Sequence, residues 1–416
     1  MNRFLLLLYG SICLLVFLRV ILASKPVDLP DGAKITANVR IVSSPQVFYG
    51  HQEIPVTIKE QKVILILPEF SEYRYGDQVR ISGILKKKVL DNKKTVYSIY
   101  FPSIQKVKGD MGVFYQAAGF VRVRVTEAFN RYLPPNEASL LLGVVLGVSS
   151  TVSKDLKLDF QTTGVTHVVA ASGMNVTLLA GFLLPIFLRF YRRQHALLLT
   201  ILCLFFYALI SGLSASIVRA TLMASISYIG LMVGRQRTAF ISFFLTGSIM
   251  VLLSPSVISD IGFQLSFAAT LGMLLISPLI PSFSKLPLIR LVEDDLKTTI
   301  AAQITTLPIL LMYFHSFGLF SILVNTLVLW TIPPLMVVGS LASFVALISI
   351  QLGGILAFIC LPLLSYFIAT ISFFASYSAT MTISNLPLSV EIGYYLVVGG
   401  GVWWLRRHTK QNATQT

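Results

Sequence analysis

The chain has 416 residues, of which 55% are hydrophobic and only 12% are charged. Soluble domains carry about 25% charged residues, so this composition excludes a mainly soluble protein and places most of the chain in lipid. Lys and Arg number 33 against 18 Asp and Glu, a net charge of +15. Cys13, Cys203 and Cys360 lie inside apolar runs and show neither a disulfide nor a zinc pattern. We therefore expect a membrane protein without a metal centre.

Residues 1–24 contain an apolar run from Phe4 to Val20 behind a single Arg3. Two interpretations fit this pattern: a signal peptide with a weak cleavage site at residues 22–24, or an uncleaved transmembrane helix. Arg19 interrupts the approach to that cleavage site, so we favour the helix.

Residues 25–110 differ from the rest, with 14 Lys and Arg against nine Asp and Glu, a net charge of +5. Apolar residues alternate in short stretches such as Ile35-Ala37-Val39-Ile41, and turn residues such as Gly76-Asp77 separate these stretches. Alternation between turns is typical of half-buried strands. We predict a small soluble β-domain of about five strands, an OB-like barrel inserted after the first helix.

Residues 111–161 mix charged and apolar side chains. Arg122, Arg124 and Arg131 stand among apolar residues between positions 112 and 133, a pattern typical of an interfacial helix lying along a bilayer. Residues 138–147 are apolar but too short to span, so they predict a re-entrant or buried segment.

Residues 162–405 form a series of apolar runs, which predicts a polytopic α-helical domain because about 20 such residues cross a bilayer. One run is over-long and broken by Pro333-Pro334, and we count it as a single crossing. With the first helix, the runs predict about ten transmembrane helices. The runs are 168–188, 196–212, 217–234, 238–253, 261–280, 298–314, 317–350, 355–375 and 392–405.

The loops between these runs fall into a basic and a neutral set. Residues 255–260, 377–391 and the turn at Leu213 carry no Lys or Arg. By the positive-inside rule, both termini, including the tail 406–416, are cytoplasmic and the β-domain faces outward. The basic loops carry Arg189, Arg192, Arg193, Arg235, Arg237, Lys285, Arg290, Lys297, Arg406, Arg407 and Lys410.

Polar side chains inside the runs are the functional candidates, because a charge at a helix centre costs roughly 2.5–3.5 kcal/mol on insertion scales. Arg219 is the one basic residue well inside a run, and Ser172 and Asn175 share one helix face. We expect a polar path through the bundle that can meet an anion. The candidate path residues are His167, Ser172, Gly173, Asn175, Arg219, Asp260, Gln264 and Asn325.

Simpler interpretations of these residues stay open. Ser172 and Asn175 also suit hydrogen bonds between helices, and Arg219 suits an outward reach to the headgroups or an ion pair with Asp260. His167 lies about 140° from Ser172 around a regular helix, which disfavours a Ser–His nucleophile pair.

In the β-domain, OB-like barrels bind single strands by stacking bases on aromatic side chains beside a basic groove. Besides Tyr75, the aromatic candidates are Tyr73, Tyr97 and Tyr100. In the alternative interpretation, the aromatic residues fill the core and the lysine run is solvated. The candidate DNA-binding residues are Tyr75, Arg74, Arg80, Lys86, Lys87 and Lys88.

Four motifs occur in order along the chain. The first, Thr163-Gly164-Val165-Thr166-His167-Val168-Val169-Ala170-Ala171-Ser172-Gly173, resembles the T-G-x-x-H-x-x-A-x-S-G stretch of the ComEC-type competence family. Residues 216–220, 262–267 and 317–325 with Pro333 resemble three further stretches of that family. The family commonly has Leu-His after Ser-Gly, where this chain has Met174-Asn175, so the role of that histidine does not transfer.

The resemblance implies a channel that passes single-stranded DNA through the bacterial cytoplasmic membrane in natural transformation. The expected partners are the bilayer, other competence proteins, a separate ATPase or helicase and, as an open alternative, further copies of the chain. Many members continue into a metallo-β-lactamase-like domain, but this sequence lacks an H-x-H-x-D-H cluster. We therefore expect a short form with no metal, cofactor or enzymatic activity, and any strand degradation would need a nuclease on another chain.

Three other functions stay open on the sequence alone. The first is transport or export of a small anionic solute. The second is hydrolysis within the membrane by Ser172 and His167, and the third is binding of duplex DNA at the surface without transport.

Overall fold

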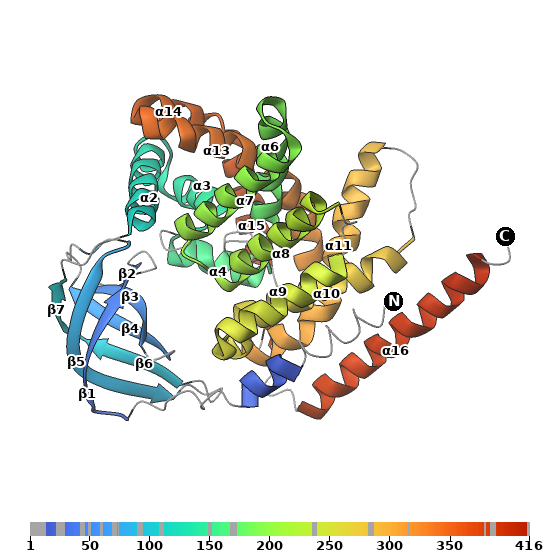
Figure 1. Cartoon of the computed structure of the whole chain (residues 1–416), viewed down its shortest axis with the longest axis horizontal. Helices are drawn as coiled ribbons and strands as arrows, with labels where there is room; N and C mark the ends of the chain where they lie inside the picture. The colour runs from blue at the N-terminus through green and yellow to red at the C-terminus, as the bar shows by residue number, and fades with distance from the viewer. Residues whose placement is uncertain are drawn as a thin grey trace.

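Figure 1 shows the protein as a computed structural model, with a curled β-domain beside a larger bundle of helices. The fold is mostly helical, and residues 14–21 near the N-terminus are also helical. The structure describes residues 14–21, 30–41, 46–48, 51–58, 61–68, 73, 75–89, 95–107, 112–148, 152–166, 173–234, 239–281, 287–314, 316–318, 320–377, 380–382 and 388–413.

Seven strands build the β-domain, in the order β1-β5-β6-β4-β3-β2, with β7 paired to β5. β4 and β6 run parallel, and the other pairs are antiparallel. The strands are β1 (Lys34–Arg40), β2 (Gln46–Phe48), β3 (His51–Ile58), β4 (Gln61–Pro68), β5 (Gln78–Val89), β6 (Thr95–Tyr100) and β7 (Ser103–Lys106).

The sheet curls around one apolar core because β5 pairs with different strands along its length. Its first part pairs with β1 and β7, and its last part pairs with β6. Gly83 lies just before this change, and a Cβ there would lie only 2.4 Å from Cγ2 of Ile99, so glycine allows the close crossing. The alternating apolar residues of the strands, such as Val63 and Leu65, are fully buried inside the curl.

This sheet corrects two details of the sequence prediction. The chain has seven described strands in place of about five, because β2 and β7 have only three and four residues, too few for alternation to show. The strand order runs from β1 to β2 without closing among the described strands, so a barrel of the OB type is not confirmed.

Three helices connect the β-domain to the bundle: α2 (Val113–Tyr132), α3 (Pro135–Leu146) and α4 (Lys154–Thr162). All residues of α3 from Ala138 onward are buried, which confirms the buried interpretation of that short apolar segment. α2 packs one face against α3, α7, α13 and α14 and leaves Phe114 and Phe120 on its other face exposed. Its predicted orientation along a bilayer stays a prediction.

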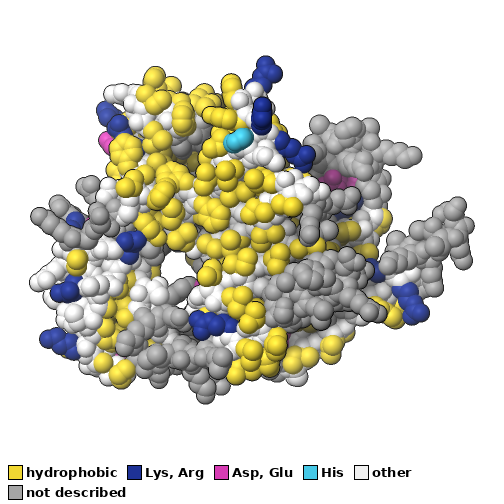
Figure 2. All heavy atoms as spheres, viewed as in Figure 1, with side chains coloured by type: hydrophobic (Ala, Val, Ile, Leu, Met, Phe, Trp, Pro, Cys, Tyr) yellow, Lys and Arg dark blue, Asp and Glu magenta, His cyan; other side chains and the backbone are white. Residues whose placement is uncertain are grey.

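The bundle follows in a second series of helices, and a short ladder pairs β8 (Ser316–Gly318) with β9 (Thr380–Thr382). On the face shown in Figure 2, hydrophobic side chains cover much of the bundle. The helices are α6 (Gly173–Phe190), α7 (Arg193–Ile210), α8 (Ala215–Met232), α9 (Ala239–Leu253), α10 (Ile261–Leu275), α11 (Pro287–Phe314), α12 (Ser321–Val328), α13 (Ile332–Ile348), α14 (Ile350–Phe358), α15 (Leu361–Tyr377) and α16 (Leu388–Ala413).

Five helical segments among the described residues are long and apolar enough to cross a membrane, or six if α14 and α15, bent by 53°, form one span. The ten predicted crossings are therefore not confirmed. α9 has only 15 residues, which at about 1.5 Å per residue is short of a bilayer core. The predicted single crossing at 317–350 agrees with one continuous candidate. The five segments are Gly173–Phe190, Arg193–Ile210, Ala215–Met232, Ile261–Leu279 and Ser321–Ile348.

Candidate functional site

Arg219 lies where α6, α8 and α10 meet. Only 7% of the residue is exposed, although it belongs to a candidate membrane span. Its Nη1 donates a hydrogen bond to the carbonyl oxygen of Ser266 in α10, at 2.6 Å. Its guanidinium also covers Gly173, the first residue of α6, where a Cβ would lie 2.5 Å from Nη2. Glycine at this position therefore makes room for the guanidinium.

The charge of Arg219 has no carboxylate partner in the described part of the chain. Its Nε is buried and has no hydrogen-bond partner among those residues. Ser216, one turn earlier on α8, shares a hydrogen bond with Ser266, with 3.1 Å between the two Oγ atoms. A buried cation without a counter-ion is unfavourable unless another group compensates it. Arg219 is therefore the strongest candidate in the bundle for contact with an anion.

Asp260 and Gln264 have local roles at the start of α10. Asp260 is the N-cap residue, and its Oδ1 accepts a hydrogen bond from the backbone N–H of Phe263 at 3.1 Å. A carboxylate is favoured there because the helix N-terminus carries unpaired donors and a partial positive charge. Gln264 donates from Nε2 to the carbonyl oxygen of Ile258 at 2.9 Å. The structure thus gives Asp260 and Arg219 different partners, in place of the ion pair that the sequence suggested.

His167 and Ser172 lie outside the described residues, but both ends of their motif are placed. Gly164, before them, has φ +74° and lies against Ser321 of α12. A Cβ added at position 164 would lie 2.5 Å from the Cβ of Ser321. Gly173, after them, faces Arg219. Each glycine of the motif therefore permits a contact that a larger side chain would block.

Asn175 and Asn325 are both almost fully buried. Asn175 donates from Nδ2 to the carbonyl oxygen of Val144 at 2.8 Å, which ties α6 to α3, as the simpler interpretation expected. The Oδ1 of Asn325 has no hydrogen-bond partner among the described residues. One turn earlier on α12, Ser321 accepts a hydrogen bond from the side chain of Gln303 in α11. α11 and α12 therefore add a second polar group beside the Gly164 turn.

Ser266 and Ser321 are not among the site residues predicted from the sequence. Serine is common in packed membrane helices, so neither residue type nor spacing marks these two. The available signal was their position inside the motifs at 262–267 and 317–325.

Tyr75 lies at the junction between the β-domain and the bundle. It is 9% exposed, and its hydroxyl donates to the carbonyl oxygen of Leu209 near the end of α7. Arg122 of α2 covers its ring, with 4.2 Å between Cζ and the ring centre. A base cannot stack on a ring that is already covered, so the structure corrects the predicted DNA contact of Tyr75.

A second arginine–tyrosine pair crosses this junction, and here the arginine comes from the β-domain and the tyrosine from α2. Arg40 of β1 lies over the ring of Tyr115 in α2, with 4.4 Å from Cζ to the ring centre. Each part thus supplies one arginine and one tyrosine, and cation–π contacts favour both pairs. Burial lowers the pKa of Arg122 to about 10, with Tyr75 acting in the opposite direction, so this arginine stays protonated at neutral pH.

The other DNA-binding candidates are spread over the β-domain. Arg80 is exposed and donates from Nε to Oδ1 of Asn38 at 3.0 Å, and Lys86 is exposed over the ring of Tyr100. Lys87 is half-buried. Arg74 and the side chain of Lys88 lie outside what the structure describes. Tyr97 is buried in the sheet core, in agreement with the alternative interpretation of the aromatic residues.

We expect Tyr75→Phe to lower the stability of the junction by about 1 kcal/mol, because one hydrogen bond is lost while the ring stays over Arg122. Thermal unfolding of the purified protein in detergent measures this as a lower midpoint. Tyr100→Phe is the matched control, since Tyr100 is half exposed and should leave the midpoint unchanged. Equal midpoints for the two variants would contradict the assigned hydrogen bond.

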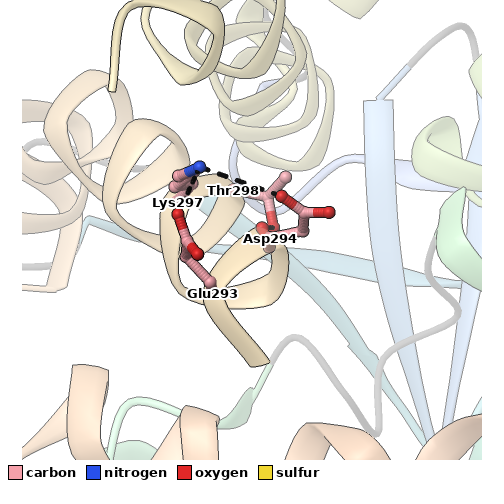
Figure 3. A network of polar contacts seen from close by, with 4 residues as sticks. All are labelled: Glu293, Asp294, Lys297 and Thr298. Carbon is pink, nitrogen blue, oxygen red and sulfur yellow. Dashed lines mark hydrogen bonds and ion pairs between the residues drawn. The ribbon is translucent and has the colours of Figure 1, made fainter. Parts of the chain in front are cut away.

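A compact charged group lies in the first half of α11 (Figure 3). Lys297 places Nζ 2.7 Å from Oε1 of Glu293 and 3.9 Å from Oδ1 of Asp294. Lys297 and Glu293 are both buried, so this lysine is largely neutralised and contributes less to the loop asymmetry than its formal charge suggests. No group of three His, Cys, Asp or Glu side chains that could hold a metal ion occurs among the described residues.

α16 is attached to α11 beside Pro308. A proline inside a helix has no N–H to donate, so the carbonyl of Ile304, four residues earlier, loses its helical partner. Tyr394 donates its hydroxyl to this carbonyl oxygen at 2.9 Å, and Tyr395 donates to that of Thr305 at 2.9 Å. Two tyrosine hydroxyls of α16 therefore donate hydrogen bonds to carbonyl oxygens of α11 near Pro308, where one backbone donor is missing.

We expect the double variant Tyr394→Phe with Tyr395→Phe to loosen α16 from α11, because both donors are lost. Two hydrogen bonds of about 1 kcal/mol each predict roughly ten- to thirty-fold faster local amide exchange. Hydrogen–deuterium exchange of peptides from 302–310 and 388–400 measures this change. Tyr377→Phe is the control, because Tyr377 is 70% exposed; unchanged exchange in the double variant would exclude the attachment.

Residues 144–408, well over half of the chain, match the Competence protein family. This chain belongs to that family. The match covers Gly164, Gly173, Arg219 and Asn325, so the polar positions described above lie within the family region, and the family predicted from the four motifs is confirmed.

Three curated proteins are similar over part of their length. ComE operon protein 3 of Bacillus subtilis is 28% identical over 318 residues, 73% of this chain and 38% of that protein. Competence protein ComA of Neisseria gonorrhoeae is 29% identical over 52% of this chain and 32% of that protein. The uncharacterized protein YcaI of Escherichia coli is 25% identical over 52% of this chain and 29% of that protein. The chain thus spans about a third of the length of these relatives. No solved structure matches.

Proposed function

We propose that this protein provides the path by which single-stranded DNA crosses the bacterial cytoplasmic membrane in natural transformation. Membership of the Competence protein family supports a role in competence for DNA uptake. The observation that carries the proposal is Arg219, a buried guanidinium inside the bundle without a carboxylate partner among the described residues.

In this proposal, phosphates of the strand contact Arg219 one after another. A guanidinium is always charged at neutral pH and donates to phosphate oxygens in a fixed geometry, so it suits this contact. The neutral side chains of Gln303, Ser321 and Asn325 offer further contacts that carry no net charge. Few fixed charges hold each phosphate weakly, which a conduit requires, because the cargo must leave as readily as it binds.

The proposed arrangement places both termini in the cytoplasm and the β-domain outside, where it would receive the strand. The sequence has no P-loop, so the driving force would come from an ATPase or helicase on another chain, or from a gradient. This chain would contribute no chemical step, and a nuclease elsewhere would degrade the second strand.

The test is transport into sealed vesicles. The purified protein is reconstituted in proteoliposomes, a fluorescent single-stranded 40-mer is added outside, and external nuclease then removes what has not entered. We expect a protected fraction that vesicles without the protein lack. In parallel, deletion of the gene should abolish natural transformation while electroporation of the same DNA still succeeds. No protected strand together with normal transformation would reject the proposal and leave a small anion as the candidate cargo.

A further inference from the structure

A pocket of about 520 Å³ lies between strands β1 and β5 of the β-domain and the start of α2. Its polar side chains are Asn38, Arg40, Gln78 and Tyr115, from β1, β5 and α2, and three valines complete its wall. The pocket is therefore amphipathic. The three valines are Val39, Val79 and Val107.

Positive charge gathers at this pocket, and no acidic side chain pairs with its arginines among the described residues. Arg40 lies over Tyr115, and its Nε has no hydrogen-bond partner among the described residues. Arg122 is buried close by against Tyr75, and its Nε and Nη1 also lack partners there. The neighbouring carboxylate of Asp77 is paired with Lys106, at 3.4 Å. Arg40, which lines the pocket, and Arg122, which is buried nearby, together favour an anion there.

The depth of the pocket follows from the hydrogen bond of Tyr75 to Leu209. Leu209 is the next-to-last residue of α7, a candidate membrane span, and the end of a span lies near the lipid headgroups. Tyr75 contacts Arg122 and so fixes the junction at this level. A bilayer crossed by α7 would place these anion-binding groups at the depth of lipid phosphates.

The adjacent surface of α2 is apolar and exposed. Val113 and Phe114, next to Tyr115 in the sequence, are 78% and 70% exposed, and Phe120 and Val123 are 55% and 50% exposed. Apolar side chains beside basic ones on an interfacial helix are suited to acyl chains below a headgroup. A DNA backbone would need none of this apolar surface, so the surroundings favour a lipid over a strand.

We propose that the pocket between β1, β5 and α2 binds the headgroup of an anionic phospholipid. Arg40 contacts the phosphate, Asn38, Gln78 and Tyr115 contact the polar headgroup, and the exposed apolar side chains of α2 contact the acyl chains. The bound lipid would join the β-domain to the bundle, because its ligands come from both parts. This role is separate from the proposed path at Arg219.

The experiment uses the full chain in nanodiscs made either of phosphatidylcholine alone or with 20% phosphatidylglycerol. We expect phosphatidylglycerol to raise the thermal unfolding midpoint and to remain bound in native mass spectra after detergent extraction. Arg40→Gln, which keeps a polar side chain but removes the charge, should weaken retention of phosphatidylglycerol by about ten-fold, the effect of one charged hydrogen bond. Lys34→Gln, the same charge change at the far end of β1, should retain the lipid normally.

Further variants keep the result decisive if Arg40→Gln fails to fold. Arg40→Lys keeps the charge but loses the planar fork, and Tyr115→Phe removes only a hydroxyl; both should give intermediate retention. Equal retention of phosphatidylglycerol by the wild type and all Arg40 and Tyr115 variants would overturn the proposal. Displacement of the lipid by a single-stranded 20-mer would also overturn it and assign the pocket to DNA.

Discussion

Arg219→Ala is expected to lower natural transformation by about 100-fold while the protein still inserts in the membrane. The variant removes a charged donor from the meeting point of α6, α8 and α10, and one such interaction contributes roughly 1.5–3 kcal/mol. Transformation frequency, normalised to the amount of protein in the membrane fraction, measures the effect. Arg193→Ala makes the same chemical change at an exposed position and should transform normally.

Two glycine substitutions on α6 test whether the position of the Arg219 guanidinium matters for uptake, in addition to its presence. Gly173→Ala keeps Arg219 but places a Cβ 2.5 Å from Nη2, so the guanidinium must move. Gly181→Ala, on the same helix, meets no atom within 4 Å. We expect reduced uptake for the first variant and normal uptake for the second. Normal uptake by both Arg219→Ala and Gly173→Ala would remove Arg219 from the path.

The sequence predicted the helical parts of this fold well because their apolar runs are long. Each run from 196 onward contains helix, and the motif glycines Gly164 and Gly173 mark close contacts. The number of crossings was harder to predict. Hydropathy finds an apolar run but not the break between α14 and α15, and it does not show that α9 is only 15 residues long.

The junction with the β-domain could not be predicted from sequence patterns. Arg40, Tyr75, Tyr115 and Arg122 are distant in the chain, and no periodicity links a strand residue such as Arg40 to a helix residue 75 positions later. The basic, polar stretch around Tyr75 favours a base-stacking role, whereas tertiary packing covers its ring with Arg122. Local composition therefore does not show which surface of the β-domain packs against the helices, and DNA binding by this domain stays a prediction.

Gly272→Val is expected to have the largest effect on folding. Gly272 of α10 faces α11, where a Cβ would lie 2.3 Å from the carbonyl oxygen of Ala301 and 2.4 Å from Oγ1 of Thr305. A backbone oxygen cannot rotate away as a side chain can, so the two helices must separate. Overpacking of this kind costs about 1–3 kcal/mol or more, and small residues at helix contacts are how membrane helices approach closely. Size-exclusion chromatography of a fluorescent fusion should show little monodisperse protein.

Gly230→Ala, a glycine of α8 with no atom within 4 Å, is the control and should elute like the wild type. A monodisperse Gly272→Val protein would contradict the close α10–α11 contact. The two helices also carry parts of the candidate path, because α10 provides Ser266 for Arg219 and α11 provides Gln303 for Ser321. Separation of α10 from α11 therefore removes transport through loss of structure, whereas Arg219→Ala removes it in a folded protein. Chromatography and transformation measured on the same two variants distinguish a packing position from a path residue.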